Sequence, residues 1–517
     1  MAVDRATGAL IRRSVLHGTL SNYAGKLVML AIGLLVTPFV LAHIGPTDFG
    51  LLALVGSVVA YGSLLDLGIS GAVIKYVAHH ATRGEEREAR ATIATALLLY
   101  TALGAVAAVL GLILAPFFPT LFHIPPAQHA TARGLVMLMG LGIGISIPGA
   151  VPAAILAGLR RFDILNLVGI TAALLSAAAT VAVLLLGGGI LAITAANIGV
   201  TLVTQALNLG LLRRIAPGLL PGWRDAAHER VRAIASFSAS VFAVQVAGRV
   251  QSKTDEVVIA AFLPVSAVTP FALARRLGEI PQTLTDQFMK VLLPLAATLD
   301  ATDDRGRLRE VWLTGTRLTL ALCAPLSGGL AVLGGPVLAA WVGPAYAGYG
   351  PLVTILALAI LLDTAMWPTG SVLQGMGRHR PLALIALGSA AANLGLSIGL
   401  APRYGLIGVA LGTLIPTAIE ASCIVLPYAM RTLGISGRAM WRSVLAPVIA
   451  PAGLMLLVLV LASQHLGTDS PPALVTVAVA GGVTYGMAYM ILARGLSERE
   501  MVMGGMTQVM ARWRARS

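Results

Sequence analysis

The chain consists of apolar runs of about twenty residues, separated by short segments that carry most of the charge. A helix of about twenty residues spans the ~30 Å hydrocarbon core of a bilayer and satisfies its own backbone hydrogen bonds. Only 11% of the 517 residues are charged and 57% are hydrophobic, so water cannot solvate the surface of such a chain. The sequence predicts an all-α polytopic membrane protein of about fourteen transmembrane helices, near residues 20–43, 49–78, 91–116, 131–157, 163–186, 190–212, 234–262, 266–296, 311–333, 351–375, 381–400, 406–429, 444–465 and 472–493.

Arginine is distributed unequally between alternate loops. With fourteen alternating helices, one side of the membrane receives 26 arginines, whereas the opposite loops hold only Arg403. Because basic loops stay in the cytoplasm, this distribution predicts an even number of spans with both termini cytoplasmic, in a bacterial inner membrane. It also accounts for the net charge of +14. A nucleic-acid partner is not expected, since that would require a soluble basic domain.

Two stretches of the chain carry the same residue types at matching helix ends when one is shifted by 217 residues. The coinciding residues are glycines and arginines near helix ends: Gly158 with Gly375, Arg161 with Arg378, Gly188 with Gly405, and Arg214 with Arg431. Further upstream, the break between helices at Gly45-Pro46 matches that at Leu263-Pro264 when the shift is 218 residues instead of 217. Both stretches begin on the same side of the membrane, so the pattern predicts two six-helix lobes related as a parallel repeat, as in alternating-access transporters.

The repeat divides the chain into four expected parts. Residues 1–212 form an N-terminal lobe, 213–233 a cytoplasmic linker, and 234–430 a C-terminal lobe. Residues 431–517 add two helices and a basic cytoplasmic tail. Gly140, Gly142 and Gly144 within the fourth helix predict close packing against a neighbouring helix.

The seventh and eighth expected helices each carry a polar stripe. The first stripe is Gln245, Arg249, Lys253 and Glu256, and the second is Arg275, Glu279, Gln282, Asp286 and Lys290. The spacing places each set on one helix face, with Asp255 and Arg276 off the stripes. Since a charged stripe toward lipid is costly, we expect both faces to line a cavity between the lobes.

Two interpretations of these cations remain open. Arg249, Lys253 and Arg275, with Gln245 and Gln282, can bind phosphate and sugar, because the arginine fork donates two parallel hydrogen bonds to phosphate oxygens. Alternatively, the cations only neutralise neighbouring carboxylates, Arg249 or Lys253 with Glu256 and Arg275 with Glu279. Lys26, on the first helix, is a further substrate candidate, although it lies close enough to the cytoplasm to extend its ammonium there.

Asp66, Asp363 and Glu420 each lie in an otherwise apolar helix. A buried carboxylate can bind Na+ or a proton and so couple transport to an ion gradient. Thr413, Pro416 and Thr417 place further oxygens near Glu420. Pairing with an arginine, or a protonated carboxyl, is the alternative at each position. The carboxylates of the stripes, Glu256, Glu279 and Asp286, are further candidates for ion coupling.

The sequence offers no pattern for catalysis. It lacks GxxxxGK[ST], HExxH and any Ser/His/Asp or Cys/His set, and Cys323 and Cys423 lie singly in apolar segments. We therefore expect neither an enzyme nor a metal centre, and no cofactor beyond a coupling Na+ or H+.

Five segments resemble the polysaccharide flippases of the multidrug/oligosaccharidyl-lipid/polysaccharide (MOP) exporter superfamily. They are Ile44-Gly45-Pro46-Thr47-Asp48-Phe49-Gly50-Leu51, the turn Leu65-Asp66-Leu67-Gly68-Ile69, Val73-Ile74-Lys75-Tyr76-Val77-Ala78, Val291-Leu292-Leu293-Pro294, and Leu373-Gln374-Gly375-Met376-Gly377-Arg378. The resemblance implies the V-shaped two-lobe fold and a flippase for an undecaprenyl-diphosphate-linked oligosaccharide, moved from the cytoplasmic to the periplasmic leaflet. Membrane lipids and polysaccharide polymerase or assembly proteins are the implied partners.

Several alternatives stay open. The two extra C-terminal helices are more like the lipid II flippase branch, and a cation-coupled multidrug antiporter would share the two-lobe plan. A major-facilitator transporter is disfavoured because the loop after His79 lacks an Asp-Arg-x-Gly-Arg-Arg-like turn. A glycan polymerase or ligase would need a large periplasmic loop with acid and base residues, and the expected loops are short.

Overall fold

The computed structural model describes residues 2–122, 124–220, 231 and 253–492, and every regular element in these ranges is a helix. The helices before residue 220 are α1 (Ala2–Gly62), α2 (Ile69–Arg83), α3 (Glu86–Leu114), α4 (Phe118–Leu121), α5 (His129–Gly149), α6 (Val151–Gly158), α7 (Phe162–Leu185) and α8 (Ile190–Ile215). Those after residue 262 are α10 (Val268–Ala301), α11 (Arg305–Val342), α12 (Gly350–Gly375), α13 (His379–Ile419), α14 (Leu426–Leu433), α15 (Gly437–Met440), α16 (Ala446–Leu466) and α17 (Pro471–Leu492). π-Helical turns occupy Glu420–Val425 and Trp441–Leu445.

The all-α polytopic fold predicted from the sequence is confirmed. Ten helical stretches of the described chain are long and apolar enough to cross a membrane. Two of them, residues 25–80 and 379–433, have 56 and 55 residues. At about 1.5 Å per residue each exceeds twice the ~30 Å hydrocarbon thickness. The total of fourteen spans and the layout of the two lobes stay predictions.

Large aliphatic side chains cover the outward faces of these helices. Leu186 is 87% exposed, Leu35 76% and Leu384 72%. A water-soluble protein rarely exposes so many apolar side chains in continuous stretches. Such exposure is characteristic of a membrane-embedded protein, whose apolar faces meet lipid chains.

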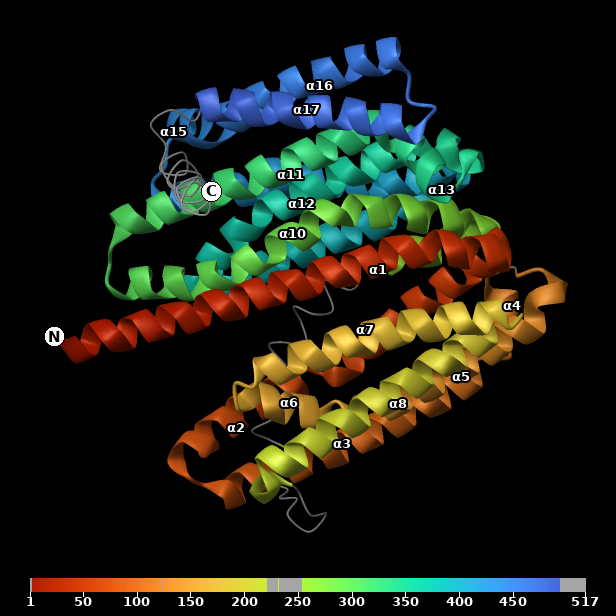
Figure 1. The fold of residues 1–517 in the computed structure, drawn as a ribbon, viewed down its shortest axis with the longest axis vertical. Coiled ribbons are helices and arrows are strands. Elements are labelled where there is room, and N and C mark those ends of the chain that lie inside the picture. The colour runs from red at the N-terminus through yellow and green to blue at the C-terminus, as the bar shows by residue number, and fades with distance from the viewer. Residues whose placement is uncertain (1, 123, 221–230, 232–252, 493–517) are drawn as a thin grey trace, which may run out of the picture. The chain divides into compact units, whose positions relative to one another are not determined.

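The described helices group into two compact units, which we describe separately. Unit 1 comprises Met1–Ala272 and Ala386–Thr413. Its core lies where α2, α3 and α6 pack together and includes Ile93, Tyr100, Ile155 and Leu212. Figure 1 shows α3, α5 and α8 side by side along much of their length. The close packing expected at Gly140 and Gly144 is confirmed, since a Cβ on Gly140 would lie 2.8 Å from the Cα of Gly111 on α3.

Unit 2 comprises Leu273–Ile385 and Leu414–Ser517. Trp312 on α11 is fully buried at its centre and donates to Thr369 on α12 over 2.9 Å. Arg317 on α11 is only 4% exposed and donates to the backbone oxygen of Ser443 over 2.8 Å. This bond ties α11 to the π-helical turn that precedes α16. Figure 1 shows α16 and α17 lying against each other.

The chain reverses direction at two glycines that adopt a positive φ. Gly187 has φ 78° and separates α7 from α8, whereas Gly405 has φ 57° and ψ −135° within α13. The hydroxyl of Ser397, before Gly405, donates to the backbone oxygen of Val409 beyond it. α13 is therefore a helical hairpin, and its reversal lies at the break predicted between residues 400 and 406.

Equivalent glycines pack in equivalent ways in the two halves of the predicted repeat. A Cβ on Gly158 would lie 2.9 Å from Val77 on α2, and one on Gly375 would lie 2.9 Å from Ala296 on α10. In each half of the predicted repeat, the end of the fourth expected span (α6 or α12) thus closely contacts the second expected span (α2 or α10). This agreement supports the repeat, while the boundaries predicted at residues 212, 233 and 430 stay predictions.

The structure differs from the sequence prediction within the expected helix 131–157. The helix breaks between Gly149 and Val151, giving α5 and α6. Pro148 and Pro152 flank the break, and neither proline can donate a backbone hydrogen bond. The side chain of Gln205 on α8 donates to the backbone oxygen of Ser146 over 3.3 Å and so satisfies one carbonyl beside the break.

The reversal at Gly405 generates a stability prediction. Gly405→Ala should destabilise the protein by about 1–3 kcal/mol, because this φ/ψ combination is strained for any residue with a Cβ. No atom lies within 4 Å of the added Cβ, so strain is the only cost. Gly399→Ala on the same hairpin, where the helix is regular and space is also free, is the matched control and should be neutral or slightly stabilising. Thermal unfolding of both variants in detergent measures the difference, and equal melting temperatures would contradict the strain at Gly405.

Candidate functional site

Asp363 on α12 is the centre of a polar cluster in unit 2. Gln282 on α10 donates its Nε2 to Asp363 Oδ2 over 3.1 Å, and Trp367 donates its indole N–H to the same oxygen over 3.3 Å. A carboxylate in an apolar helix is tolerated when donors replace the lost water. The structure thus brings together two of the predicted site residues, Gln282 and Asp363.

Arg275 and Glu279 occupy the next turns of α10 and form an ion pair of 3.0 Å. The Arg275 side chain is 14% exposed and that of Glu279 42%. Arg275 and Glu420 both lie close enough to Asp363 to interact with it electrostatically. Glu420 is 8% exposed and begins a π-helical turn, a geometry that often accompanies functional sites. We call Arg275, Glu279, Gln282, Asp363, Trp367 and Glu420 the Asp363 cluster.

A second cluster lies in unit 1 around Asp255, which is fully buried. The hydroxyl of Thr413 lies 3.0 Å from one carboxylate oxygen of Asp255 and 3.2 Å from the other. Asn393 donates its amide to the Thr413 hydroxyl over 2.9 Å and to the backbone oxygen of Gly412 over 3.2 Å. We call Asp255, Asn393 and Thr413 the Asp255 cluster.

The Asp255 cluster has the chemistry of a cation site. Asn393 is 2% exposed, and its side-chain oxygen is buried without a hydrogen-bond donor. Carboxylate, amide and hydroxyl oxygens are ligands for hard cations such as Na+, whereas transition metals favour imidazole and thiolate. Among the described residues, no three His, Cys, Asp or Glu side chains are grouped to hold a metal ion.

Asp66 lies at the start of α2, where three donors surround its carboxylate. The backbone N–H and the hydroxyl of Ser70 donate to Asp66 Oδ1 over 3.3 and 2.6 Å, and the Tyr100 hydroxyl also donates to it. Ser70 and Tyr100 hydroxyls lie 2.7 Å apart. This network caps α2 and joins it to α3, as a side-chain oxygen does at a helix N-terminus. An ion-coupling role for Asp66 stays a prediction.

The other predicted site residues are scattered or outside the described chain. Gln245 and Arg249 lie outside the described residues. Lys253, Asp286 and Lys26 are partly buried, whereas Glu256 is 4% exposed and its Oε2 accepts no hydrogen bond. The cavity that these residues were expected to line stays a prediction.

Sequence reasoning missed Asn393 and set Asp255 aside because it lies off the stripe of the seventh helix. A usable signal was present nonetheless. Under the shift of 217 residues, Asn393 and Ser397 coincide with Ser176 and Thr180, which contact Asn197 in the hairpin of α7 and α8. Polar residues recurring at the same place in two apolar hairpins indicate a structural role there.

Comparison with known proteins finds similarity to polysaccharide biosynthesis and transport proteins. The sequence model of a family described as polysaccharide biosynthesis protein matches residues 40–351. The chain is 23% identical to the probable flippase AglR of Haloferax volcanii, over 92% of this chain and 96% of that protein. It is 27% identical to the succinoglycan biosynthesis transport protein ExoT of Rhizobium meliloti, over 90% of each chain.

Solved transporter structures have the same fold. The lipid II flippase MurJ, in an inward closed conformation, has a TM-score of 0.72 at 16% identity, covering 93% of this chain and 99% of that one. An inward-facing multidrug resistance transporter of the MATE family, within the MOP superfamily, has a TM-score of 0.68 at 15% identity, covering 79% of this chain and 94% of that one. At these identities the likeness concerns the fold alone.

The bond between Gln282 and Asp363 generates a test of the Asp363 cluster. Gln282→Met should destabilise the protein by about 1–3 kcal/mol, since it removes a donor to a buried carboxylate at nearly constant side-chain length. In an Asp363→Leu background the same change should cost little, because no carboxylate is left to satisfy. Thermal unfolding of the four proteins gives the coupling between the two positions. Additive effects would mean that the two side chains do not interact.

Proposed function

The chain belongs to the family of polysaccharide biosynthesis proteins, and from this premise we propose that it is a flippase for a lipid-linked oligosaccharide. Its substrate is an oligosaccharide on undecaprenyl diphosphate, which it moves from the cytoplasmic to the periplasmic leaflet by alternating access. The observation that carries the proposal is full-length similarity to a probable flippase and to a succinoglycan transport protein. Both relatives are named for transport and not for catalysis.

The orientation of the chain follows from its arginines. Both termini and the arginine-rich loops lie in the cytoplasm of a bacterial inner membrane, since basic loops are retained on that side. Polymerase and assembly proteins of the same polysaccharide pathway, on the other side, receive the translocated unit.

The anionic headgroup binds cations of the two polar helices. Arg275 is the described residue best suited to this role, because it is largely buried yet its partner Glu279 is 42% exposed and can be exchanged for a phosphate. Arg249, Lys253 and Lys26 supply further positive charge, and Gln245 and Gln282 hydrogen-bond sugar hydroxyls. The lipid tail remains in the bilayer while the headgroup crosses.

A cation couples transport to an ion gradient, and we place it at the Asp255 cluster. The support is the buried carboxylate, the undonated oxygen of Asn393 and the hydroxyl of Thr413, which together offer only hard oxygen ligands. Na+ is the favoured ion and H+ the alternative. The Asp363 cluster, with Glu420, is the second candidate, and its arginine makes it less suited to a bare cation.

Proteins with this fold suggest two alternative substrates. Lipid II is the alternative suggested by the two C-terminal helices, α16 and α17, and a cationic drug is the alternative suggested by the multidrug branch. All three substrates can be offered to the same reconstituted protein.

Reconstitution tests the function and the role of Arg275 together. In proteoliposomes, the protein should move a fluorescent oligosaccharide on undecaprenyl diphosphate into the outer leaflet, where a membrane-impermeant quencher reaches it. Arg275→Glu should slow this movement by about tenfold to a hundredfold, the loss expected for a charged hydrogen bond to phosphate. Arg276→Glu, one residue away and off the stripe, is the matched control and should retain transport.

Full transport by the Arg249→Ala, Arg275→Ala double variant would contradict headgroup binding by these cations. Faster movement of lipid II than of the oligosaccharide lipid would assign the chain to cell-wall synthesis instead. Movement of a cationic drug without movement of either lipid would contradict the flippase proposal itself.

Ion binding is tested by the stability of the purified protein. At a Na+ concentration of a hundred times its Kd, a single site should stabilise the wild-type protein by about 2.7 kcal/mol. Asp255→Asn should lose this effect because it removes the charged ligand, whereas Asp363→Asn should keep it. Melting temperatures are compared with choline at equal ionic strength. Equal stabilisation by choline, or by Na+ in Asp255→Asn, would contradict a Na+ site at this cluster.

A further inference from the structure

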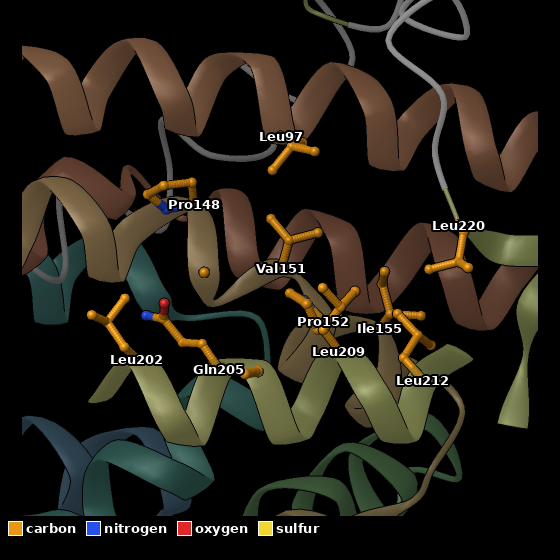
Figure 2. A pocket seen from close by; sticks show the side chains of 12 residues that line it. Leu97, Pro148, Val151, Pro152, Ile155, Leu202, Gln205, Leu209, Leu212 and Leu220 are labelled. Carbon is orange, nitrogen blue, oxygen red and sulfur yellow. The ribbon is translucent and has the colours of Figure 1, made fainter. Parts of the chain in front are cut away.

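Unit 1 contains an apolar cavity of about 330 Å³ at the break between α5 and α6. Figure 2 shows Pro148, Val151, Pro152 and Ile155 from the break lying between Leu97 of α3 on one side and α8 on the other. Leu202, Gln205, Leu209 and Leu212 of α8 complete the lining, together with Leu220 at one end. Protein interiors seldom contain voids much larger than a water molecule, so a cavity of this size calls for an occupant.

The lining excludes a polar occupant. Gln205 is the sole lining residue with a polar side chain, and its amide nitrogen already donates to the Ser146 backbone oxygen. The amide lies over Gly149, where a Cβ would come within 2.0 Å of it. The glycine therefore lets Gln205 close the backbone break without filling the cavity. A sugar or a diphosphate would find almost no hydrogen-bond partners in this lining, whereas a hydrocarbon chain needs none.

The cavity opens toward the surface of unit 1. Leu202 is 45% exposed and Ala206 is also exposed, and both line the cavity. Since the surface helices are covered by lipid, the opening admits a hydrocarbon chain from the bilayer rather than water.

The depth of the cavity corresponds to one leaflet. Leu202 lies eleven residues before Arg213 on α8, about 17 Å along the helix axis. That is about half of the ~30 Å hydrocarbon core, the thickness available to a single acyl chain of one leaflet. A much longer isoprenoid tail would exceed this depth.

Three arginines lie near the end of the cavity that Leu212 lines. Arg213 and Arg214 follow the lining residue Leu212 directly and are exposed. Arg90, seven residues before Leu97 on α3, adds a third cation at the corresponding end of that helix. Basic residues at this level attract anionic lipid headgroups.

We propose that this cavity binds one acyl chain of an anionic phospholipid from the arginine-rich leaflet, with its phosphate held by Arg213 and Arg214. The bound chain fills the space at the break and holds α6 against α8. This inference depends on the membrane fold and does not rest on the transported substrate.

Photolabelling of the full-length protein in vesicles tests the proposal. The probe is a phosphatidylglycerol with a diazirine in the middle of one acyl chain, and labelled peptides are identified by mass spectrometry. Labelling should concentrate in residues 148–155 and 202–212 and should be competed by unlabelled phosphatidylglycerol. A phosphatidylcholine probe with the same chain should label these peptides less by about tenfold to thirtyfold, the effect of two interfacial arginines.

Two variants test separately the binding of the acyl chain and the binding of the lipid headgroup. Ala206→Phe, which fills the opening, should abolish the labelling, whereas Ala195→Phe, an exposed alanine nearer the other end of α8, should leave it unchanged. The Arg213→Gln, Arg214→Gln double variant should lose the preference for phosphatidylglycerol, and the Arg380→Gln, Arg438→Gln double variant should keep it. Undiminished labelling of Ala206→Phe would overturn the proposal, as would wild-type protein without headgroup preference. Stronger competition by undecaprenyl phosphate would also overturn it and assign the cavity to an isoprenoid.

Discussion

Hydrocarbon offers no hydrogen bonds, and this constraint governs the whole structure. Each backbone donor and acceptor must find its partner within the protein, so the chain crosses as helices and reverses only where local geometry permits. Gly187 and Gly405 provide two reversals through positive φ values that other residues rarely adopt. The break between α5 and α6 is tolerated because Gln205 reaches across from α8 to a carbonyl beside it. At these three places the irregular backbone coincides with a glycine or is bonded by a specific side chain.

The same constraint applies to buried charges, each of which needs polar partners within the protein. Asp66 satisfies it through hydrogen bonds from Ser70 and Tyr100 at the start of α2. Asp363 accepts hydrogen bonds from Gln282 and Trp367 and lies within electrostatic range of Glu420 and Arg275. Asp255 receives a neutral hydroxyl beside an amide oxygen that no donor reaches. The three carboxylates thus differ in the donors that surround them, and their roles in ion coupling stay predictions.

Much of the fold could be predicted from the sequence because it depends on local properties. The length of the apolar runs determines where the helices lie, and glycines determine where the chain reverses direction. The spacing of Arg275 and Glu279 places their ion pair on one helix face. The Asp255 cluster could not be predicted in this way, since it joins residues 158 positions apart. Helical periodicity sorts the faces of a single helix but does not say which neighbour each face meets. The break at Gly149 was missed for a related reason, because prolines within apolar helices are common in membranes and only the neighbouring Gln205 reveals an actual interruption.

The two hairpins that the predicted repeat aligns share a similar polar contact but differ in charge. Ser176 and Thr180 contact Asn197 in the hairpin of α7 and α8, and Asn393 contacts Thr413 at the matching place in α13. Both hairpins therefore carry a polar contact between apolar helices. Where the break at Gly45 aligns with that at Leu263, Asp255 falls on Thr37, which donates to its own helix at Gly33. Among the described residues, the hairpin of α13 contacts a buried carboxylate, and this contact is the difference on which the proposed cation site rests. A transporter needs such an asymmetry, because an ion that stabilised both halves alike would not favour one conformation over the other.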